Sequence, residues 1–196
     1  FGGTTSSFPA IKRTTTYLSM PLADDTLPGL IDAEVFVTTT AANTLASDNS
    51  LQPVFAAAND VLTLRASTTY FFEVLYFIDT GTTTHTTATG FAASSAFTGI
   101  NYLAEIWSTT SGTISTTAPS VLDVAVSTAV VLNATSVAPR TTIRIRGIIR
   151  TNASTTVTPQ IQFSANPTGT NETAVNSFFR AWPVGSNTVA SFGNWA

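Results

Sequence analysis

Two carboxylates, Glu73 and Glu105, lie within otherwise apolar stretches of the chain. Two acids across a cleft, one of them in an apolar pocket, are the pair that glycoside hydrolysis requires. A buried acid without a partner is costly, so each carboxylate is better explained as the partner of an arginine. The candidate partners are Arg144, Arg146 and Arg150, which can equally contact a neighbouring subunit or bind an acidic glycan. We favour pairing within the chain, followed by subunit contact and then ligand binding.

The other residues that could do chemistry are too few or unsuitably spaced. His85 is the only histidine and lies in a run of threonines, so we expect a turn residue rather than a catalytic or metal-binding one. No G-x-S-x-G sequence marks a hydrolase nucleophile. Asp24 and Asp25 are adjacent, but nothing around them has the spacing of a calcium loop. We therefore predict no catalytic residue, no metal site, no cofactor and no enzymatic activity.

The composition argues against several classes of partner. The chain has 196 residues, of which 43% are hydrophobic and 10% charged, with 8 Lys and Arg together and a net charge of −3. So small a basic content argues against nucleic-acid binding, and no nucleotide-binding or RNA-binding motif occurs. The absence of cysteine excludes disulfides and thiol chemistry. The longest apolar stretch, near residues 70–78, is interrupted by Glu73 and too short for membrane insertion.

The elements that position these residues are expected to be strands. Residues 1–30 are rich in Gly, Thr, Ser and Pro, which predicts an extended N-terminal arm. In residues 31–196, short β-branched and aromatic stretches are separated by turn residues. We place one helical turn at 52–58 and strands at 33–37, 61–65, 69–79, 89–93, 100–107, 122–126, 130–134, 141–151, 156–164 and 177–183. The expected fold is all-β, an antiparallel two-sheet β-sandwich that is jelly-roll-like.

The strand at 69–79 is apolar on both faces. Five large apolar residues share one face, and Phe71, Leu75 and Phe77 share the other with Glu73. An antiparallel strand normally has one wet face, so this strand is either central and covered or packed against a second subunit. The aromatic C-terminus is also poorly suited to water. The candidate subunit interface therefore consists of Phe71, Leu75, Phe77, Arg144, Arg146, Arg150, Phe192 and Trp195.

Several longer stretches carry a family resemblance. They are FGGTTSSFPAIKR (1–13), LADD (22–25), LQPVFAAANDVLTLRASTTYFFE (51–73), TGTTTHTTATGF (80–91), TPQIQFSANPTGTN (158–171) and SFFRAWPVGSNTVASFGNWA (177–196). Together they cover most of the chain and resemble structural proteins of tailed-bacteriophage virions, of the tail-fibre or capsid-decoration type. The later stretches are similar to a C-terminal β-module of such proteins.

The resemblance implies a non-enzymatic structural protein on the exterior surface of a virion. It also implies a homotrimer that contacts other virion proteins, such as the major capsid or tail proteins, and that stabilises the particle or contacts the host. Host surface glycans are a further expected partner, and capsid decoration and a tail or fibre position stay open as alternatives. A protein of another class also fits the sequence, a carbohydrate-binding β-sandwich module at a receptor-binding tip, in which Trp107, Trp182 or Trp195 stacks on sugar rings.

Overall fold

The computed structural model describes residues 12–13, 18–19, 35–57, 59–110, 113–114, 120–136 and 140–188. The chain divides into two compact units, Phe1–Ala33 and Glu34–Ala196. In the first unit, β1 (Lys12–Arg13) pairs antiparallel with β2 (Leu18–Ser19). The rest of the predicted arm, 1–30, lies outside the described residues, and so do Asp24 and Asp25.

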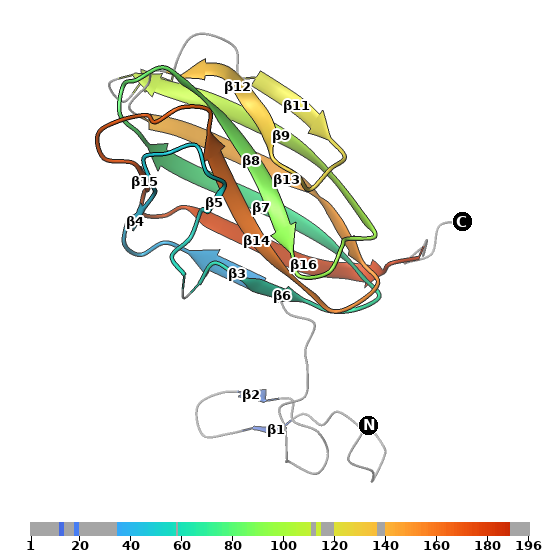
Figure 1. The fold of residues 1–196 in the computed structure, drawn as a ribbon. Coiled ribbons are helices and arrows are strands. Elements are labelled where there is room, and N and C mark those ends of the chain that lie inside the picture. The colour runs from blue at the N-terminus through green and yellow to red at the C-terminus, as the bar shows by residue number, and fades with distance from the viewer. Residues whose placement is uncertain are drawn as a thin grey trace. The chain divides into compact units, whose positions relative to one another are not determined.

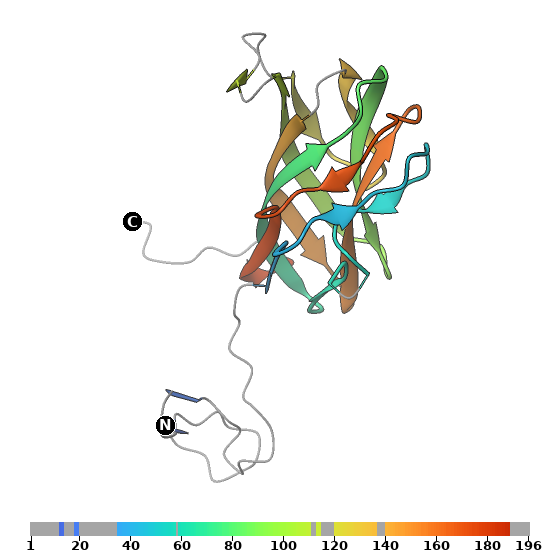
Figure 2. The same ribbon diagram turned by 90° about the vertical axis from the view of Figure 1, so that its left-hand side faces the viewer.

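In the second unit, the described residues form two sheets in which every strand pair is antiparallel, and no helix (Figure 1 and Figure 2). The larger sheet has nine described strands: β3 (Val35–Thr38), β4 (Asn43–Thr44), β7 (Thr68–Asp79), β9 (Gly99–Thr110), β10 (Thr113–Ile114), β11 (Ser120–Val124), β13 (Arg140–Thr151), β15 (Glu172–Thr173) and β16 (Phe178–Ser186). The smaller sheet has five: β5 (Gln52–Pro53), β6 (Leu62–Leu64), β8 (His85–Ala93), β12 (Val130–Ser136) and β14 (Thr155–Phe163).

The strand order is that of a jelly roll. In the larger sheet, β3, β16, β7 and β13 are neighbours in that order, and in the smaller sheet β5 and β6 adjoin β14, followed by β8 and β12. The chain passes repeatedly from one sheet to the other, as in a double-sheet jelly roll. In the segment of chain that connects β8 to β12, the strands β9 and β11 pair antiparallel with each other. Because β9 also pairs with β13, these two strands extend the larger sheet beyond β13. The predicted all-β, antiparallel two-sheet sandwich of jelly-roll type is therefore confirmed.

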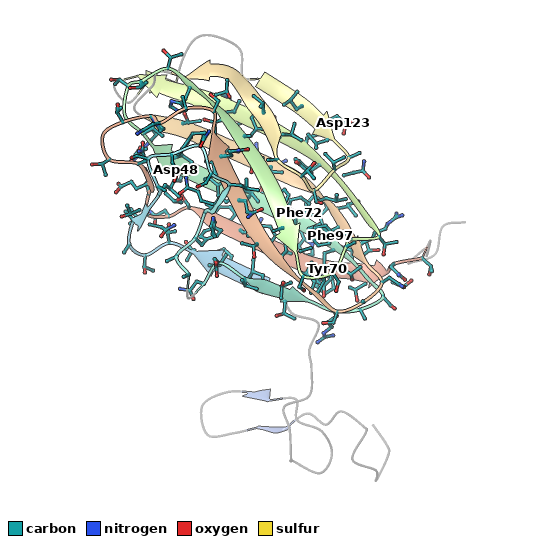
Figure 3. The ribbon with its side chains drawn as sticks, in the orientation of Figure 1. Asp48, Tyr70, Phe72, Phe97 and Asp123 are labelled. Atoms are coloured by element: carbon teal, nitrogen blue, oxygen red, sulfur yellow. The ribbon has the colours of Figure 1, made fainter. Side chains whose placement is uncertain are left out.

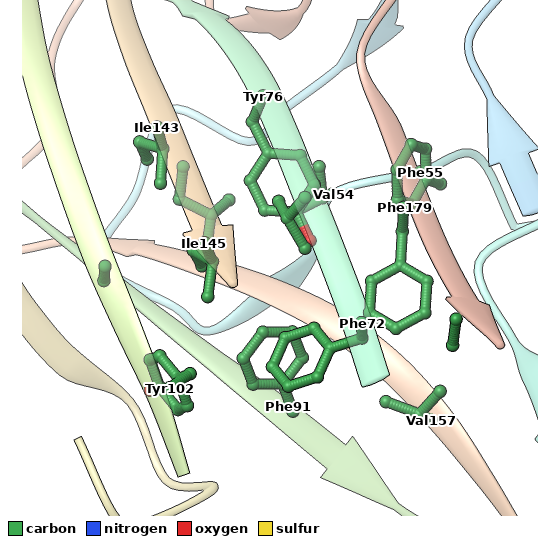
Figure 4. Close-up of a cluster of buried hydrophobic side chains, with 14 of the residues drawn as sticks. Val54, Phe55, Phe72, Tyr76, Phe91, Tyr102, Ile143, Ile145, Val157 and Phe179 are labelled. Atoms are coloured by element: carbon green, nitrogen blue, oxygen red, sulfur yellow. The ribbon is translucent and has the colours of Figure 1, made fainter. Parts of the chain in front are cut away.

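The two sheets enclose a core of large apolar side chains (Figure 4). Phe72 on β7 is fully buried, and its ring centroid lies 5.2 Å from that of Phe91 on β8 and 5.9 Å from that of Phe179 on β16. Burial of one such side chain contributes about 1.5–3 kcal/mol to stability. β7 lies between β13 and β16, so strand 69–79 is central, and its inner face is buried in the core; a second subunit over its outer face stays a prediction.

Two local expectations are wrong. Within 52–57, the chain forms β5 and bends instead of a helical turn, and Val54 N–H donates to the Pro159 carbonyl oxygen at 3.0 Å. Pairing with β14 satisfies this backbone donor across the sheet. His85 is not a turn residue but the first residue of β8, only 2% exposed, with Nδ1 2.7 Å from the Thr83 carbonyl oxygen and its ring edge against Phe163. Threonine-rich sequence forms a strand here because β-branched side chains fit a pleated, half-buried surface.

Candidate interaction surface

One surface of the larger sheet faces away from the core, and we call it the outer face. Side chains alternate along a strand, so the residues between the buried ones point outward. The outer face comprises Phe36 on β3; Phe71, Glu73, Leu75 and Phe77 on β7; Asn101, Leu103, Glu105 and Trp107 on β9; Val121 and Asp123 on β11; Thr142, Arg144, Arg146, Ile148 and Arg150 on β13; and Phe178, Arg180 and Trp182 on β16.

The outer face contains most of the interface residues expected from the sequence. They are Phe71, Leu75, Phe77, Arg144, Arg146 and Arg150. The remaining two, Phe192 and Trp195, lie outside the described residues. The fold thus brings β7 and β13 residues together on one surface, while their role as a subunit contact stays a prediction.

Glu73 lies at the centre of the outer face between two arginines that are its direct pairing partners, Arg146 on β13 and Arg180 on β16. Arg146 Nε donates to Glu73 Oε1 at 3.2 Å, and Arg180 Nε donates to Oε2 at 3.1 Å. The Glu73 side chain is 17% exposed, so these partners offset the desolvation of its charge. The expected pairing with arginine is confirmed, but sequence reasoning missed Arg180, which lies 107 residues further along the chain.

Arg144 lies between the two carboxylates that were candidates for glycoside chemistry. Its Nη1 is 3.8 Å from Glu105 Oε2, and its Nη2 is 3.9 Å from Glu73 Oε1. These distances allow an ion pair but exceed those of a hydrogen bond. Glu105 is therefore also paired with an arginine, as the cost of an unpartnered charge led us to expect.

Aromatic rings flank the arginine of β16. The guanidinium carbon of Arg180 lies 5.1 Å from the ring centroid of Trp182 and 5.9 Å from that of Phe178, which is within the range of cation–π attraction. Trp182 packs against Phe71 with ring centroids 4.9 Å apart, and Phe178 packs against Phe36 at 6.0 Å. These contacts hold the rings of neighbouring strands against one another, while each ring stays partly accessible to solvent.

A groove of about 380 Å³ lies on the outer face. It is bounded by Trp107 on β9 and Phe178 on β16, and the strands between them contribute Glu73, Leu75, Thr142 and Arg144. An apolar groove with a few polar groups is the form that binding sites commonly take. We call it the Arg144 groove.

Large hydrophobic side chains are exposed on the outer face: Phe36 is 55% exposed, Leu103 and Val121 53% each, and Ile148 39%. In the smaller sheet, Val131 on β12 is 51% exposed, but the accessible residues of β8 and β14 are small or polar, namely Thr86, Ala92, Ala93, Thr156, Thr158, Gln160 and Gln162. Exposed apolar surface in one place marks an interaction site. The outer face of the larger sheet is therefore the candidate functional site.

The other described features offer less chemistry. A cavity of about 790 Å³ lies between the loops at 94–98 and 125–129, beside Phe97 (Figure 3), and its described lining residues include no charged side chain. Within the described ranges, no group of three or more His, Asp or Glu residues could hold a metal ion. No helix of the described chain is long and apolar enough to span a membrane.

Comparisons with known proteins assign neither a family nor a function to this chain. No protein-family model and no curated protein matches the chain. A chain in the structure of infectious bursal disease virus Gx strain is similar with 11% identity and a TM-score of 0.20, over 89% of this chain and 44% of that one. A chain of the Gt strain gives 8% identity and a TM-score of 0.19, over 92% and 43%. This chain thus spans less than half the length of those chains, and similarity this weak indicates neither a shared fold nor a shared function.

Proposed function

We propose that this protein is a non-enzymatic structural component of the exterior of a tailed-phage virion, assembled as a homotrimer and serving as a capsid-decorating or tail component. The observation that carries the proposal is the outer face, where exposed apolar side chains are interleaved with arginines and half-buried rings. Interfaces between proteins are enriched in aromatic residues and arginine. Jelly rolls are also frequent among capsid and lectin domains, which agrees with the resemblance of the sequence to virion proteins.

The proposed function of the chain differs between the two placements, on the capsid and on the tail. As a capsid-decorating protein, it lies on the shell, and residues 1–30 join neighbouring capsomers. As a tail component, it is joined to a longer structure through those residues, and the loops of the sandwich contact the host surface, because loops on a rigid scaffold are where binding commonly evolves.

Quantitative mass spectrometry of purified particles tests the placement. Hundreds of copies at a fixed ratio to the major capsid protein support decoration, and a few to a few tens support a tail position. Absence of the chain from purified particles refutes a virion role.

Native mass spectrometry at micromolar concentration tests the assembly, and a mass of three chains is expected. Leu103→Glu is expected to weaken the assembly, whereas Val61→Glu, at a residue 51% exposed outside the outer face, is expected to leave it unchanged. A single-chain mass for the wild type refutes self-association.

A second candidate is a carbohydrate-binding module at a receptor-binding tip. Trp107 lines the Arg144 groove, and Trp182 lies on the same face, so a sugar ring has an aromatic surface and a nearby cation there. A glycan array tests this candidate, with binding that Trp107→Ala abolishes as the expected result. An array without signal above background for the wild type rules it out.

A further inference from the structure

We propose that the Arg144 groove of one copy receives the β11 edge of a second copy, with Asp123 placed against Arg144. The β11 edge is the group Val121, Asp123 and Leu103. This inference rests on the self-association proposed above and names the surfaces that meet. Both surfaces belong to the outer face, so each copy offers one groove and one edge.

Asp123 provides the acidic side of the contact. It lies on β11, which borders β9 at the margin of the larger sheet (Figure 3), and it is directly opposite Leu103 in the strand register. Its side chain is exposed, and among the described residues it has neither a hydrogen bond nor an ion pair. Leu103 and Val121 beside it are each 53% exposed. One acid set among exposed apolar side chains can pack into a largely apolar groove in which Arg144, beside Glu73, is the only cation among the lining residues.

Arg144 provides the basic side. Glu73 already accepts hydrogen bonds from Arg146 and Arg180. The guanidinium nitrogens of Arg144 lie farther from their carboxylate partners, 3.8 Å from Glu105 Oε2 and 3.9 Å from Glu73 Oε1. Within the described part of the chain, the guanidinium of Arg144 donates no hydrogen bond, although it has five N–H donors. Its side chain is 36% exposed in a groove that is also lined by Glu73, Thr142 and the apolar side chains of Leu75, Trp107 and Phe178. A carboxylate entering the groove can therefore form the bidentate pair that Arg144 lacks.

The spacing of the two surfaces permits closed assembly. Asp123 on β11 and Arg144 on β13 are separated by β9, which corresponds to about 10 Å across two strand spacings. Arg144 is also displaced by two residues along the strands, because Asp123 lies opposite Leu103 and Leu103 lies opposite Arg146, and no ion pair joins Asp123 to Arg144 within one copy. Copies that meet through these two surfaces can close as a two-fold pair, in which each copy gives both the edge and the groove, or as a ring when the rotation between copies closes.

Charge reversal in the full chain tests the pairing. The dissociation constant of the assembly is measured by sedimentation for the wild type, Asp123→Arg, Arg144→Asp and the double variant. Each single reversal is expected to weaken association by about tenfold or more, and the double variant is expected to recover most of the loss. Asp48→Arg is the control, because Asp48 is an exposed acid in the segment between β4 and β5 and belongs to neither surface, and its reversal is expected to leave the association unchanged. Single reversals that leave association unchanged, or a double variant that recovers nothing, overturn the inference.

A second measurement keeps the test decisive if Arg144→Asp does not fold, since that variant places three acids together. The chain has no cysteine, so single cysteines can be introduced without other disulfides. A mixture of Asp123→Cys and Thr142→Cys chains is expected to form a disulfide-linked heterodimer under mild oxidation, whereas Asp48→Cys with Thr142→Cys is expected to form none. Equal cross-linking in both mixtures overturns the inference. A wild type that associates but fails these tests refutes only the named surfaces, whereas a monomeric wild type refutes the proposed self-association itself.

Discussion

Tyr102 is expected to destabilise the fold at high pH, and its replacement by phenylalanine is expected to remove that effect. The side chain is 2% exposed, and its hydroxyl has no hydrogen-bond partner among the described residues. Burial raises the pKa of Tyr102 from 10.0 to about 12, because the phenolate is poorly solvated in the core. Between these two values, the folded chain holds a proton that the unfolded chain has released. This stability is fully present below pH 10 and is lost as the pH rises towards 12.

The magnitude follows from the two pKa values. At pH 11, the difference lowers the free energy of unfolding by about 1.4 kcal/mol relative to neutral pH. At pH 7, Tyr102→Phe removes a buried hydroxyl without a partner, which we expect to raise the free energy of unfolding by about 1 kcal/mol. Burial and the neighbouring Tyr102 also raise the pKa of Tyr76, so part of the alkaline loss persists in the variant.

Urea unfolding followed by tryptophan fluorescence at pH 7, 9 and 11 measures both effects. Tyr70→Phe is the matched control, since Tyr70 is equally buried but its hydroxyl accepts a hydrogen bond from Arg65 N–H at 2.9 Å. We expect this control to lose about 1 kcal/mol at pH 7, opposite in sign to Tyr102→Phe. If Tyr102→Phe loses as much stability as the wild type between pH 9 and 11, the argument from burial is wrong.

Three further substitutions test the packing by the same urea assay. Gly147→Ala is expected to lower the free energy of unfolding by about 3 kcal/mol, because the added carbon would lie 2.3 Å from a backbone oxygen. Gly99→Ala is the control, since no atom lies within 4 Å of the added carbon, and it is expected to change stability by less than about 1 kcal/mol. Equal effects of the two substitutions contradict the packing around Gly147. Glu73→Gln is expected to cost about 2 kcal/mol, and a change below about 0.5 kcal/mol shows that its ion pairs contribute nothing. Ser177→Ala removes the acceptor of Phe77 N–H at 3.0 Å and is expected to cost about 2 kcal/mol; unchanged stability means another acceptor replaces it.

The period of two along the strands was readable without the fold. In residues 69–79, alternation separates Phe72 and Tyr76 from Phe71 and Glu73, and the structure buries the first pair in the core. The same local rule places Arg144 and its arginine neighbours on one face of β13. Strand spacing and turn residues likewise indicated a sandwich, because these signals depend only on short stretches of chain.

Local sequence patterns predicted the wrong conformation where pairing with a distant strand determines it. Gln52 and Pro53 pair with β14, and His85 begins β8 beside Phe163, so their conformations are set by strands about 80 to 110 residues away in the sequence. The short strands β4, β5 and β15 are recognisable only by their pairing, since two residues carry no periodic pattern.

Thus the sequence by itself determined the fold class and which residues share a face of each strand, because side-chain direction follows from backbone geometry within the strand. Only the tertiary structure decided which strands are neighbours. That choice gave Glu73 its second arginine, Arg180, and placed the β9–β11 extension beyond β13. It also left Asp123 at the sheet margin and formed the Arg144 groove from four strands. The physical reason is that strand order and register depend on long-range packing, which no local pattern of residues encodes.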